Sequence, residues 1–312
     1  MNKSIRHITV IGSINMDFVS ACNKFPDCGE TVFGNDFLAN PGGKGANQAV
    51  AIARLGGNVK FIGGVGDDVI GCQLLQNMQH HNIGIENILR YANVSSGVAQ
   101  ISVNRRGDNK IIVVPGANSL VDKQCINNAI EIMKNSSMIV CQHEIPLTTI
   151  EYVLGQAIRF NVPLILNPAP AYELSDHVIH GIEILTPNES EASILTGVDV
   201  ISLDSGFKAC EKLFMKGIKN IVLTMGARGS LLYNENQKKH IPSLRVNAVD
   251  TTAAGDTFTG ALAWHIINRK SDIEQAVEFA TKAAAISVTR KGAQISMPSL
   301  EDVESFTETI LC

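Results

Sequence analysis

The sequence predicts an α/β protein with a doubly wound, mostly parallel sheet, helices on both of its faces and a small β-sheet acting as a lid. From Val59 onward, short apolar strands alternate with helical patterns, which indicates βαβ units with right-handed crossovers. Two segments break this alternation, at about 16–41 and 97–115, because they carry strand patterns with no helix between them. We therefore expect one domain over residues 1–312, with the lid strands inserted at these two segments.

Composition excludes several classes of partner. Of the 312 residues, 45% are hydrophobic and 18% charged, the net charge is −4, and no run of Lys or Arg exceeds two residues, so neither a nucleic acid nor a membrane is expected as a partner. The N-terminus lacks the apolar stretch of a secretory signal, which predicts a cytoplasmic protein. The seven cysteines, the last of them Cys312, are scattered without a C-x-x-C pair, and this favours reduced thiols over zinc or disulfides.

The first strand is predicted over residues 7–12. The turn after it has one glycine where a dinucleotide site needs G-x-G-x-x-G, so a Rossmann NAD site is disfavoured. Asn15 and Asp17 are two residues apart in an extended segment, so both side chains should face the same side. They are suited to chelating a diol, but an Asx turn at the end of the strand would use the same residues.

Within the second lid segment, two strand patterns flank a turn at residues 106–109. Within the first segment, residues 29–41 also have the pattern of short strands. Together they would form a small sheet over the main domain, and an open edge or face of that sheet would favour dimerisation. The alternative is a pair of ordinary surface hairpins.

A glycine-rich run, residues 42–48, precedes a helix of small residues. It lacks the G-x-x-x-x-G-K-[ST] spacing, so a Walker A phosphate site is not supported. The glycines allow a ligand to approach the backbone closely, although a glycine-rich turn without a ligand fits the same pattern.

Five apolar strands end in polar or turn-forming residues, which should line one rim of the sheet because ligands bind outside the carboxyl ends of parallel strands. Asn188 and Glu191 could share a hydrated Mg²⁺ or simply cap a helix. The turn 224–229, with Arg228, suits the phosphates of a nucleotide, but a plain turn would look the same. The strand ends are Gly66-Asp67-Asp68, Gln142-His143-Glu144, Asn167, Asn188 and Thr224-Met225-Gly226.

Residues 250–260 predict a helix that starts at or just before Asp256. Ala253, Ala254 and Gly255 have no side chain that could cap it, which leaves backbone N–H groups free for an anion. Asp256 then either stabilises the helix terminus or accepts a proton from an attacking hydroxyl, and the stretch alone favours stabilisation. A second helix is predicted over 273–287, followed by a basic pair with glycine, Arg290-Lys291-Gly292, that usually marks a solvated helix end.

Taken together, residues 42–48 and 250–260 resemble the two signature motifs of the ribokinase-like carbohydrate kinase family. The similarity extends over essentially the whole chain, through residues 12–17, 167–170, 187–189 and 289–294. It implies ATP-dependent phosphorylation of D-ribose at its 5-hydroxyl to D-ribose 5-phosphate, by a homodimer paired through its lid sheets. The alternatives are a kinase for 2-deoxyribose or a nucleoside, and a non-catalytic sugar-binding regulator of the same fold.

The resemblance also implies a role for each matching residue. Asp256 would be the base, and Ala253, Ala254 and Gly255 would form the anion hole. The sugar would be held by Asn15, Asp17, Gly43, Lys44, Asn47, Glu144 and Asp256. ATP would be contacted by Asn188, Thr224, Gly226, Ala227, Gly229 and Gly255, and Mg²⁺ would be organised through water by Glu191. The activating K⁺ would be bound by Asp250, Thr252, Ser287, Arg290, Gly292 and Ser296.

Three positions depart from the family pattern. Thr259 stands where these kinases often have Asn, and Thr281-Lys282 occupies the place of a His near the adenine, so the adenine contacts carry over least securely. His143 replaces an expected apolar residue beside Glu144, where it could alter the outer wall of the sugar pocket.

Overall fold

The central sheet has nine strands within the described part of the chain, in the order β13-β12-β11-β10-β9-β8-β1-β4-β5. The structure is a computed structural model that describes residues 6–173, 175 and 179–306. All neighbours from β11 to β5 are parallel, whereas β12 and β13 add antiparallel at one edge. The strands are β1 (Ile8–Ile11), β4 (Val59–Gly66), β5 (Gly84–Tyr91), β8 (Met138–Gln142), β9 (Leu164–Asn167), β10 (Ile184–Leu185), β11 (Asn220–Thr224), β12 (Ser230–Tyr233) and β13 (Lys238–Ile241).

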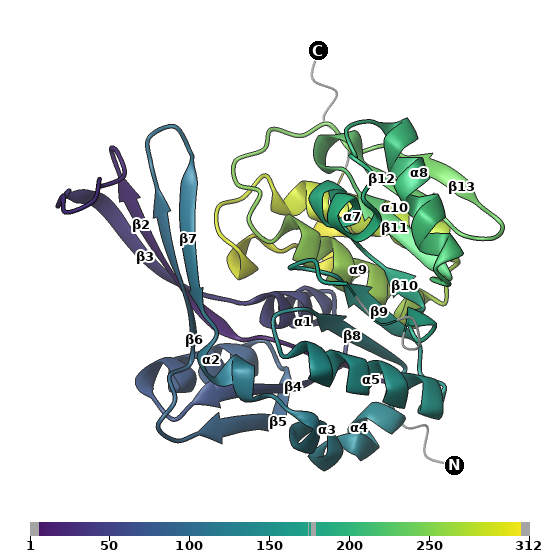
Figure 1. Cartoon of the computed structure of the whole chain (residues 1–312), viewed down its shortest axis with the longest axis horizontal. Helices are drawn as coiled ribbons and strands as arrows, with labels where there is room; N and C mark the ends of the chain where they lie inside the picture. The colour runs from purple at the N-terminus through teal and green to yellow at the C-terminus, as the bar shows by residue number, and fades with distance from the viewer. Residues whose placement is uncertain (1–5, 174, 176–178, 307–312) are drawn as a thin grey trace.

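Helices cover both faces of this sheet (Figure 1). Successive strand residues point to opposite faces, so Val10 joins one apolar core and Ile11 the other. The first core is closed by α1 (Lys44–Arg54), α2 (Val69–His80), α9 (Ala254–Arg269), α10 (Ile273–Ser287) and α11 (Leu300–Ser305). The second is closed by α3 (Lys123–Asn128), α4 (Ile130–Lys134), α5 (Leu147–Phe160), α7 (Glu189–Thr196) and α8 (Leu203–Met215). The predicted fold class is therefore confirmed.

A separate four-stranded sheet forms the lid, in the order β3-β2-β6-β7. It rises beside the main sheet (Figure 1) and consists of β2 (Asn15–Cys22), β3 (Gly34–Gly42), β6 (Gly97–Val103) and β7 (Asn109–Val114). The prediction of short strands over 29–41 is wrong in detail, because residues 29–33 lie outside any strand and 34–42 form one continuous strand. Pairing of β3 with β2 along its whole length explains this.

The helix after the glycine-rich run begins earlier than its small apolar residues suggest. α1 starts at Lys44, with Gly43 as its N-cap at φ 85°. Lys44, Asn47 and Gln48 therefore lie in the first two turns of a helix, and their side chains have fixed directions. The helices predicted at Asp256 and over 273–287 are confirmed as α9 and α10.

No helix among the described residues is long and apolar enough to cross a membrane. The six cysteines that lie in this part of the chain are free thiols, and Cys312 lies outside the described residues.

Candidate active site

The N-terminus of α9 is open. Its N-cap, Ala253, adopts the left-handed conformation at φ 59° and makes no side-chain capping bond. The N–H of Ala254 donates to the carbonyl of Thr251 at 3.2 Å, whereas those of Gly255 and Asp256 have no hydrogen-bond acceptor among the described residues. Two unpaired donors at the positive end of a helix dipole form a binding site for an anion.

The Asp256 carboxylate contacts α1, not the backbone of its own helix. Its Oδ2 accepts from Nδ2 of Asn47 at 2.9 Å and its Oδ1 from Nε2 of Gln48 at 3.0 Å. The two helices approach closely at Gly260, where an added Cβ would lie 2.6 Å from Cβ of Ala51. Asp256 is 6% exposed, so the amide pair fixes a buried carboxylate in one orientation.

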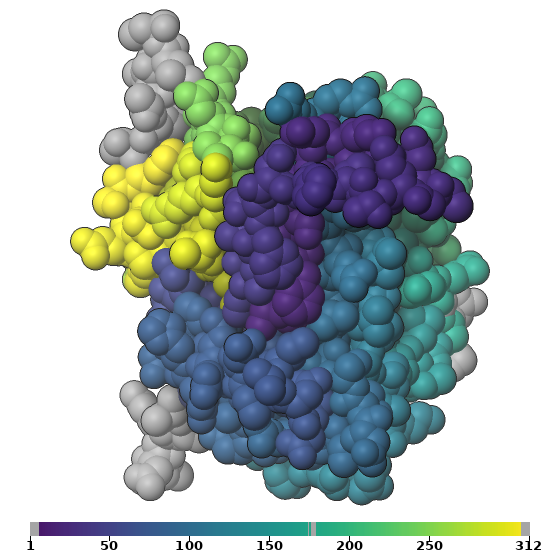
Figure 2. All heavy atoms as spheres, turned by 90° about the vertical axis from the view of Figure 1, so that its left-hand side faces the viewer, coloured from purple at the N-terminus to yellow at the C-terminus, as the bar shows by residue number. Residues whose placement is uncertain are grey.

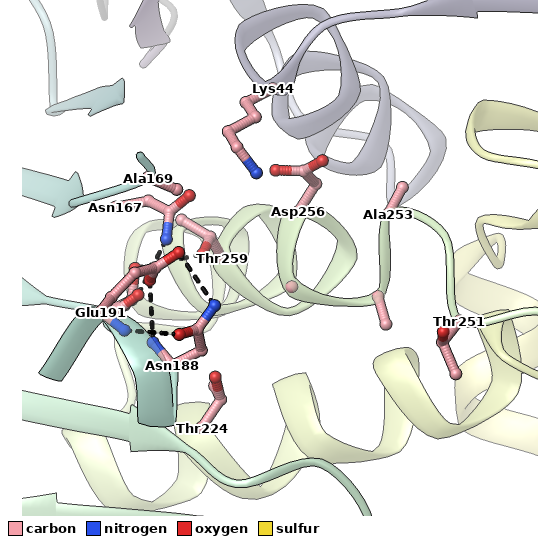
Figure 3. Close-up of a pocket in the computed structure, with 13 residues that line it drawn as sticks. Lys44, Asn167, Ala169, Asn188, Glu191, Thr224, Thr251, Ala253, Asp256 and Thr259 are labelled. Carbon is pink, nitrogen blue, oxygen red and sulfur yellow. Dashed lines mark hydrogen bonds between the residues drawn. The ribbon is translucent and has the colours of Figure 1, made fainter. Parts of the chain in front are cut away.

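Lys44 and Glu144 face Asp256 across the same space. The Glu144 Oε2 accepts from the backbone N–H of Lys44 at 3.0 Å and from Oγ of Ser13 at 2.5 Å. Figure 3 shows the Lys44 ammonium pointing toward the Asp256 carboxylate. Burial of Lys44 acts to lower its pKa, but the carboxylates of Asp256, Glu144 and Glu191 outweigh it and raise the pKa. The ammonium therefore stays charged within the site.

Asp17 and Asn15 approach this site from β2 of the lid. Burial first, and then the carboxylates of Glu144 and Asp256, raise the pKa of Asp17 to about 6. Asn15 Oδ1 accepts from Nδ2 of Asn118 at 2.7 Å. Three carboxylates thus converge on one region, an arrangement suited to hydrogen bonding with several hydroxyl groups.

A pocket of about 220 Å³ adjoins these groups, and a larger one of about 950 Å³ shares its wall at Ala254, Gly255, Asn188, Thr224 and Thr251. The open end of α9 thus lies between the two. The smaller pocket is drawn in Figure 3 and is lined by Lys44, Asn167, Ala169, Thr186, Asn188, Glu191, Thr224, Thr251, Ala253, Ala254, Gly255, Asp256 and Thr259.

Asn188 and Glu191 form the capping box that the sequence offered as one alternative. Asn188 Oδ1 accepts from the N–H of Glu191 at 2.8 Å, and the Glu191 carboxylate accepts from N–H and Nδ2 of Asn188, each at 2.9 Å. Burial is the main cause that raises the pKa of Glu191. Both residues also line the smaller pocket, so capping does not remove them from the site.

The turn after β11 lines the larger pocket with Gly226, Ala227 and Gly229. Gly229 has φ 91°, and an added Cβ would lie 2.1 Å from the carbonyl oxygen of Ile241, so only glycine fits. The Arg228 guanidinium donates to Glu189 at 2.5 Å and also to the carbonyl of Ile201. This arginine is therefore already engaged by its neighbours.

The segments proposed to bind a monovalent cation lie side by side. The N–H groups of Val249 and Asp250 donate to the carbonyl of Val288 at 2.7 and 3.2 Å, and the N–H of Gly292 donates to Asp250 Oδ2 at 2.9 Å. Asp250 Oδ1 accepts from the N–H of Thr252 at 2.9 Å.

The side chains of the other three predicted cation ligands are engaged locally. The hydroxyls of Ser287 and Ser296 donate to backbone carbonyls of their own segments, and Arg290 forms an ion pair with Asp302 at 3.1 Å. This part of the chain thus offers backbone carbonyls more than side chains.

Several sequence candidates lie elsewhere. Asp68 caps α2 and accepts from Ser96, and Asp67 pairs with Arg90 at 3.8 Å. The Asp67 and Asp68 strand end therefore contributes nothing to the rim at Asp256.

The three departures from the family pattern have clear positions. Thr259 Oγ1 lies 3.2 Å from Oγ1 of Thr186 beside the smaller pocket, and Thr281 lines the larger one. His143 is buried and its Nδ1 donates to the carbonyl of Pro170 at 3.0 Å.

Sequence reasoning missed three polar residues that bond to Asp256, Asn47 or Asn15, namely Gln48, Gln294 and Asn118. Gln48 and Gln294 lie within the family motifs at residues 42–48 and 289–294, but nothing in their spacing indicated that they bond to other site residues. Asn118 lies 103 residues from its partner Asn15.

The chain is similar to known carbohydrate kinases along its length. The family model described as "pfkB family carbohydrate kinase" matches residues 5–300. A ribokinase of Haemophilus influenzae is 40% identical, with 96% of this chain and 98% of that relative covered. A deoxyribokinase of Salmonella typhi is 39% identical, with 96% and 98% covered.

Two solved structures are also similar. The ribokinase of Thermotoga maritima has a TM-score of 0.87 at 40% identity, covering 96% of this chain and 98% of that one. The ribokinase of Arabidopsis thaliana in complex with ribose and ATP has a TM-score of 0.89 at 29% identity, covering 97% and 100%. The chain thus belongs to the pfkB family of carbohydrate kinases.

Proposed function

We propose that this kinase transfers the γ-phosphoryl group of ATP to the 5-hydroxyl of D-ribose, forming D-ribose 5-phosphate. The observation that carries this proposal is the position of the Asp256 carboxylate, which lies beside two unpaired helix N–H groups and faces Lys44. A base, an anion site and a cation at one point are what phosphoryl transfer to a hydroxyl requires.

The sugar would lie between the lid and α1. Asp17 and Glu144 are placed to accept hydrogen bonds from ring hydroxyls, with Asn15, Lys44 and Asn47 around them. Gly43 has φ 85°, and an added Cβ there would lie 2.8 Å from the N of Asn15, so only glycine fits at this point beside the proposed sugar site. The 5-hydroxyl would then point at Asp256.

In the transfer itself, Asp256 would take the proton from the 5-hydroxyl as the oxygen bonds to phosphorus. The N–H groups of Gly255 and Asp256, together with Lys44, would stabilise the charge that spreads over the transferred group. Ala253 and Ala254 would contribute to this anion hole, because their small side chains let the phosphoryl group approach the backbone. The lid would exclude water and so limit hydrolysis of ATP.

The larger pocket suits the nucleotide. Its lining includes apolar residues, among them Phe258, Ala284 and Val288, which fit a base. Asn188, Thr224, Gly226, Ala227, Gly229 and Gly255 would lie along the phosphates, where the shared wall leads to Asp256.

The donor groups fit the two ions that the family implies. Glu191, Asn188 and Thr224 present oxygen atoms to the smaller pocket, as hydrated Mg²⁺ requires, and Glu191 would bind it through water. Asp250, Thr252, Ser287, Arg290, Gly292 and Ser296 would hold K⁺, mostly through backbone carbonyls. The ions would supply positive charge that neutralises the phosphates.

The test is ADP release from Mg²⁺-ATP with D-ribose, 2-deoxyribose, adenosine or no sugar, in potassium and in sodium. We expect strong ribose-dependent turnover that is greater in potassium. The deoxyribokinase relative makes 2-deoxyribose the second candidate. We favour ribose because a site in which Asp17 and Glu144 accept hydrogen bonds from ring hydroxyls loses binding energy when one hydroxyl is missing. Sugar binding without turnover would instead support a regulatory protein.

The pKa of Asp17 predicts a pH dependence. A protonated Asp17 loses one of its acceptor positions, so kcat/KM for ribose should fall as the pH drops through about 6, where this group titrates in the free enzyme. Initial rates between pH 5 and 8 at low ribose concentration measure this. In the Asp17→Asn variant kcat/KM should be low, and its fall at acid pH should be absent. If the variant kept the same fall at acid pH, the titration would belong to another group.

We also propose that two copies pair through their lids. Residues opposite each other in register share a face, so Phe18, Phe37 and Ile112 lie on the face away from Asp17. Phe37 is 60% and Ile112 63% exposed, and Figure 2 shows the purple strands of the lid, β2 and β3, uncovered at the front of the molecule. Apolar side chains in such an open sheet favour a protein contact.

Replacement of Ile112 by Lys should therefore yield monomers, as measured by sedimentation, whereas the wild type should sediment as a dimer. Ile158→Lys, the same change at a 50% exposed isoleucine of α5 outside the lid, is the control. A wild-type monomer at micromolar concentration would contradict the pairing.

A further inference from the structure

A line of side-chain amides runs from α2 to Asp256. Asn77 Nδ2 donates to Gln294 Oε1 at 2.7 Å, and Gln294 Nε2 donates to Asn47 Oδ1 at 3.1 Å. Asn47 Nδ2 then donates to Asp256 Oδ2 at 2.9 Å. Four residues, three from α-helices and one from a short 3₁₀ helix, are thus joined by consecutive hydrogen bonds.

The direction of every bond in this line is fixed by its last member. A carboxylate oxygen only accepts, so Asn47 must present its NH₂ to Asp256 and its carbonyl oxygen to Gln294. Gln294 must therefore present its own NH₂ to Asn47, and its Oε1 to Asn77. If one amide in the line were turned over, two acceptors or two donors would face each other.

Burial makes these contacts consequential. Gln294 is 5% exposed and Asn47 6%, so a lost hydrogen bond would not readily be replaced by water. Gln294 lies in η3 (Gln294–Ser296), two residues after Gly292, whose N–H bonds to Asp250. The loop proposed to bind K⁺ is therefore connected to the carboxylate of Asp256.

We infer that Gln294 is a positioning residue that holds the Asp256 carboxylate in its reactive orientation through Asn47. The inference rests on the proposed role of Asp256 as the base. Gln294 lines neither of the two pockets. It determines which end of the Asn47 amide faces Asp256. Asn77 fixes Gln294 in the same manner, one step further away.

A double-mutant cycle tests this positioning role. Gln294→Met keeps the side-chain length but cannot donate, and it should lower kcat by about tenfold with little change in KM for ATP, because a misplaced base slows the chemical step. In an Asn47→Ala background the same change should alter kcat less than about twofold, because its route to Asp256 is already cut. Gln294→Glu should lower kcat more than Gln294→Met does, since its carboxylate forces the Asn47 amide to turn over.

Ile295→Ala is the matched control, because Ile295 is the next residue in the chain and is 77% exposed. It should leave kcat and thermal stability unchanged. The inference would be overturned if Gln294→Met lowered kcat equally in the wild type and in the Asn47→Ala background. It would also be overturned if the loss of kcat merely followed the fall in melting temperature, which would indicate a purely structural role.

A second measurement does not depend on turnover. The side-chain amide resonances of Asn47, assigned by their loss in Asn47→Ala, should shift in Gln294→Met and stay in place in Ile295→Ala. If the wild type phosphorylates no sugar, the proposed function fails, and these resonances still decide the contact: an unchanged Asn47 signal in Gln294→Met overturns the inference.

Discussion

Replacement of Asp256 by Asn is expected to lower kcat for ribose by roughly 10³-fold, the loss typical of removing a general base. The amide has nearly the same shape but cannot take a proton from the 5-hydroxyl. It also places an NH₂ group opposite the NH₂ groups of Asn47 or Gln48, which now donate to the carboxylate. ADP release at saturating ribose and ATP measures the effect.

The control for this change is Asp204→Asn. Asp204 also lies in the first turn of a helix, α8, but it is exposed and lines neither pocket. If Asp256 merely stabilised a helix terminus, the two variants would lose similar stability and neither would lose kcat. A variant Asp256→Asn that retains most of its turnover would remove Asp256 from the mechanism.

Replacement of Lys44 by Met should lower kcat/KM by roughly 10²-fold, because it removes the positive charge that faces the transferred phosphoryl group. Met fills much of the same volume, so the packing around α1 should persist. The carboxylates of Asp256, Glu144 and Glu191, which raise the pKa of Lys44, would then lack a nearby cation. Steady-state kinetics with varied ATP, together with thermal unfolding, separate the loss of catalysis from any loss of stability.

Lys123→Met serves as its control, since Lys123 is likewise the first residue of a helix, α3, but is exposed. It should keep wild-type kinetics. A Lys44→Met enzyme with unchanged kcat/KM would show that the helix N–H groups alone suffice for the phosphoryl group.

Local patterns were sufficient for β1, β4, β8, β9, β10 and β11 and for helices α1, α9 and α10, whereas β5, β12 and β13 were not predicted. The fully apolar strands and the 273–287 helix are defined by short-range periodicity, so they could be predicted within a residue or two. The exact start of α1 could not be predicted, because glycine-rich residues have low helix propensity, and in the structure the first turn of α1 packs against Ser13, just after β1. An added Cβ at Gly45 would lie 2.7 Å from the N of Ser13, which shows how close that packing is.

The sequence by itself determined the fold class, the lid segments, the bare helix at Asp256 and the family motifs, because each depends on residues near one another in the chain. Only the tertiary structure decided what those residues contact. Asp256 meets Asn47 and Gln48 across more than 200 residues of sequence, and Gln294 reaches Asn47 across 247. A local pattern contains no information about such pairs, since they form only when the packing of α1 against α9 brings polar groups together in a buried place where each must find a partner.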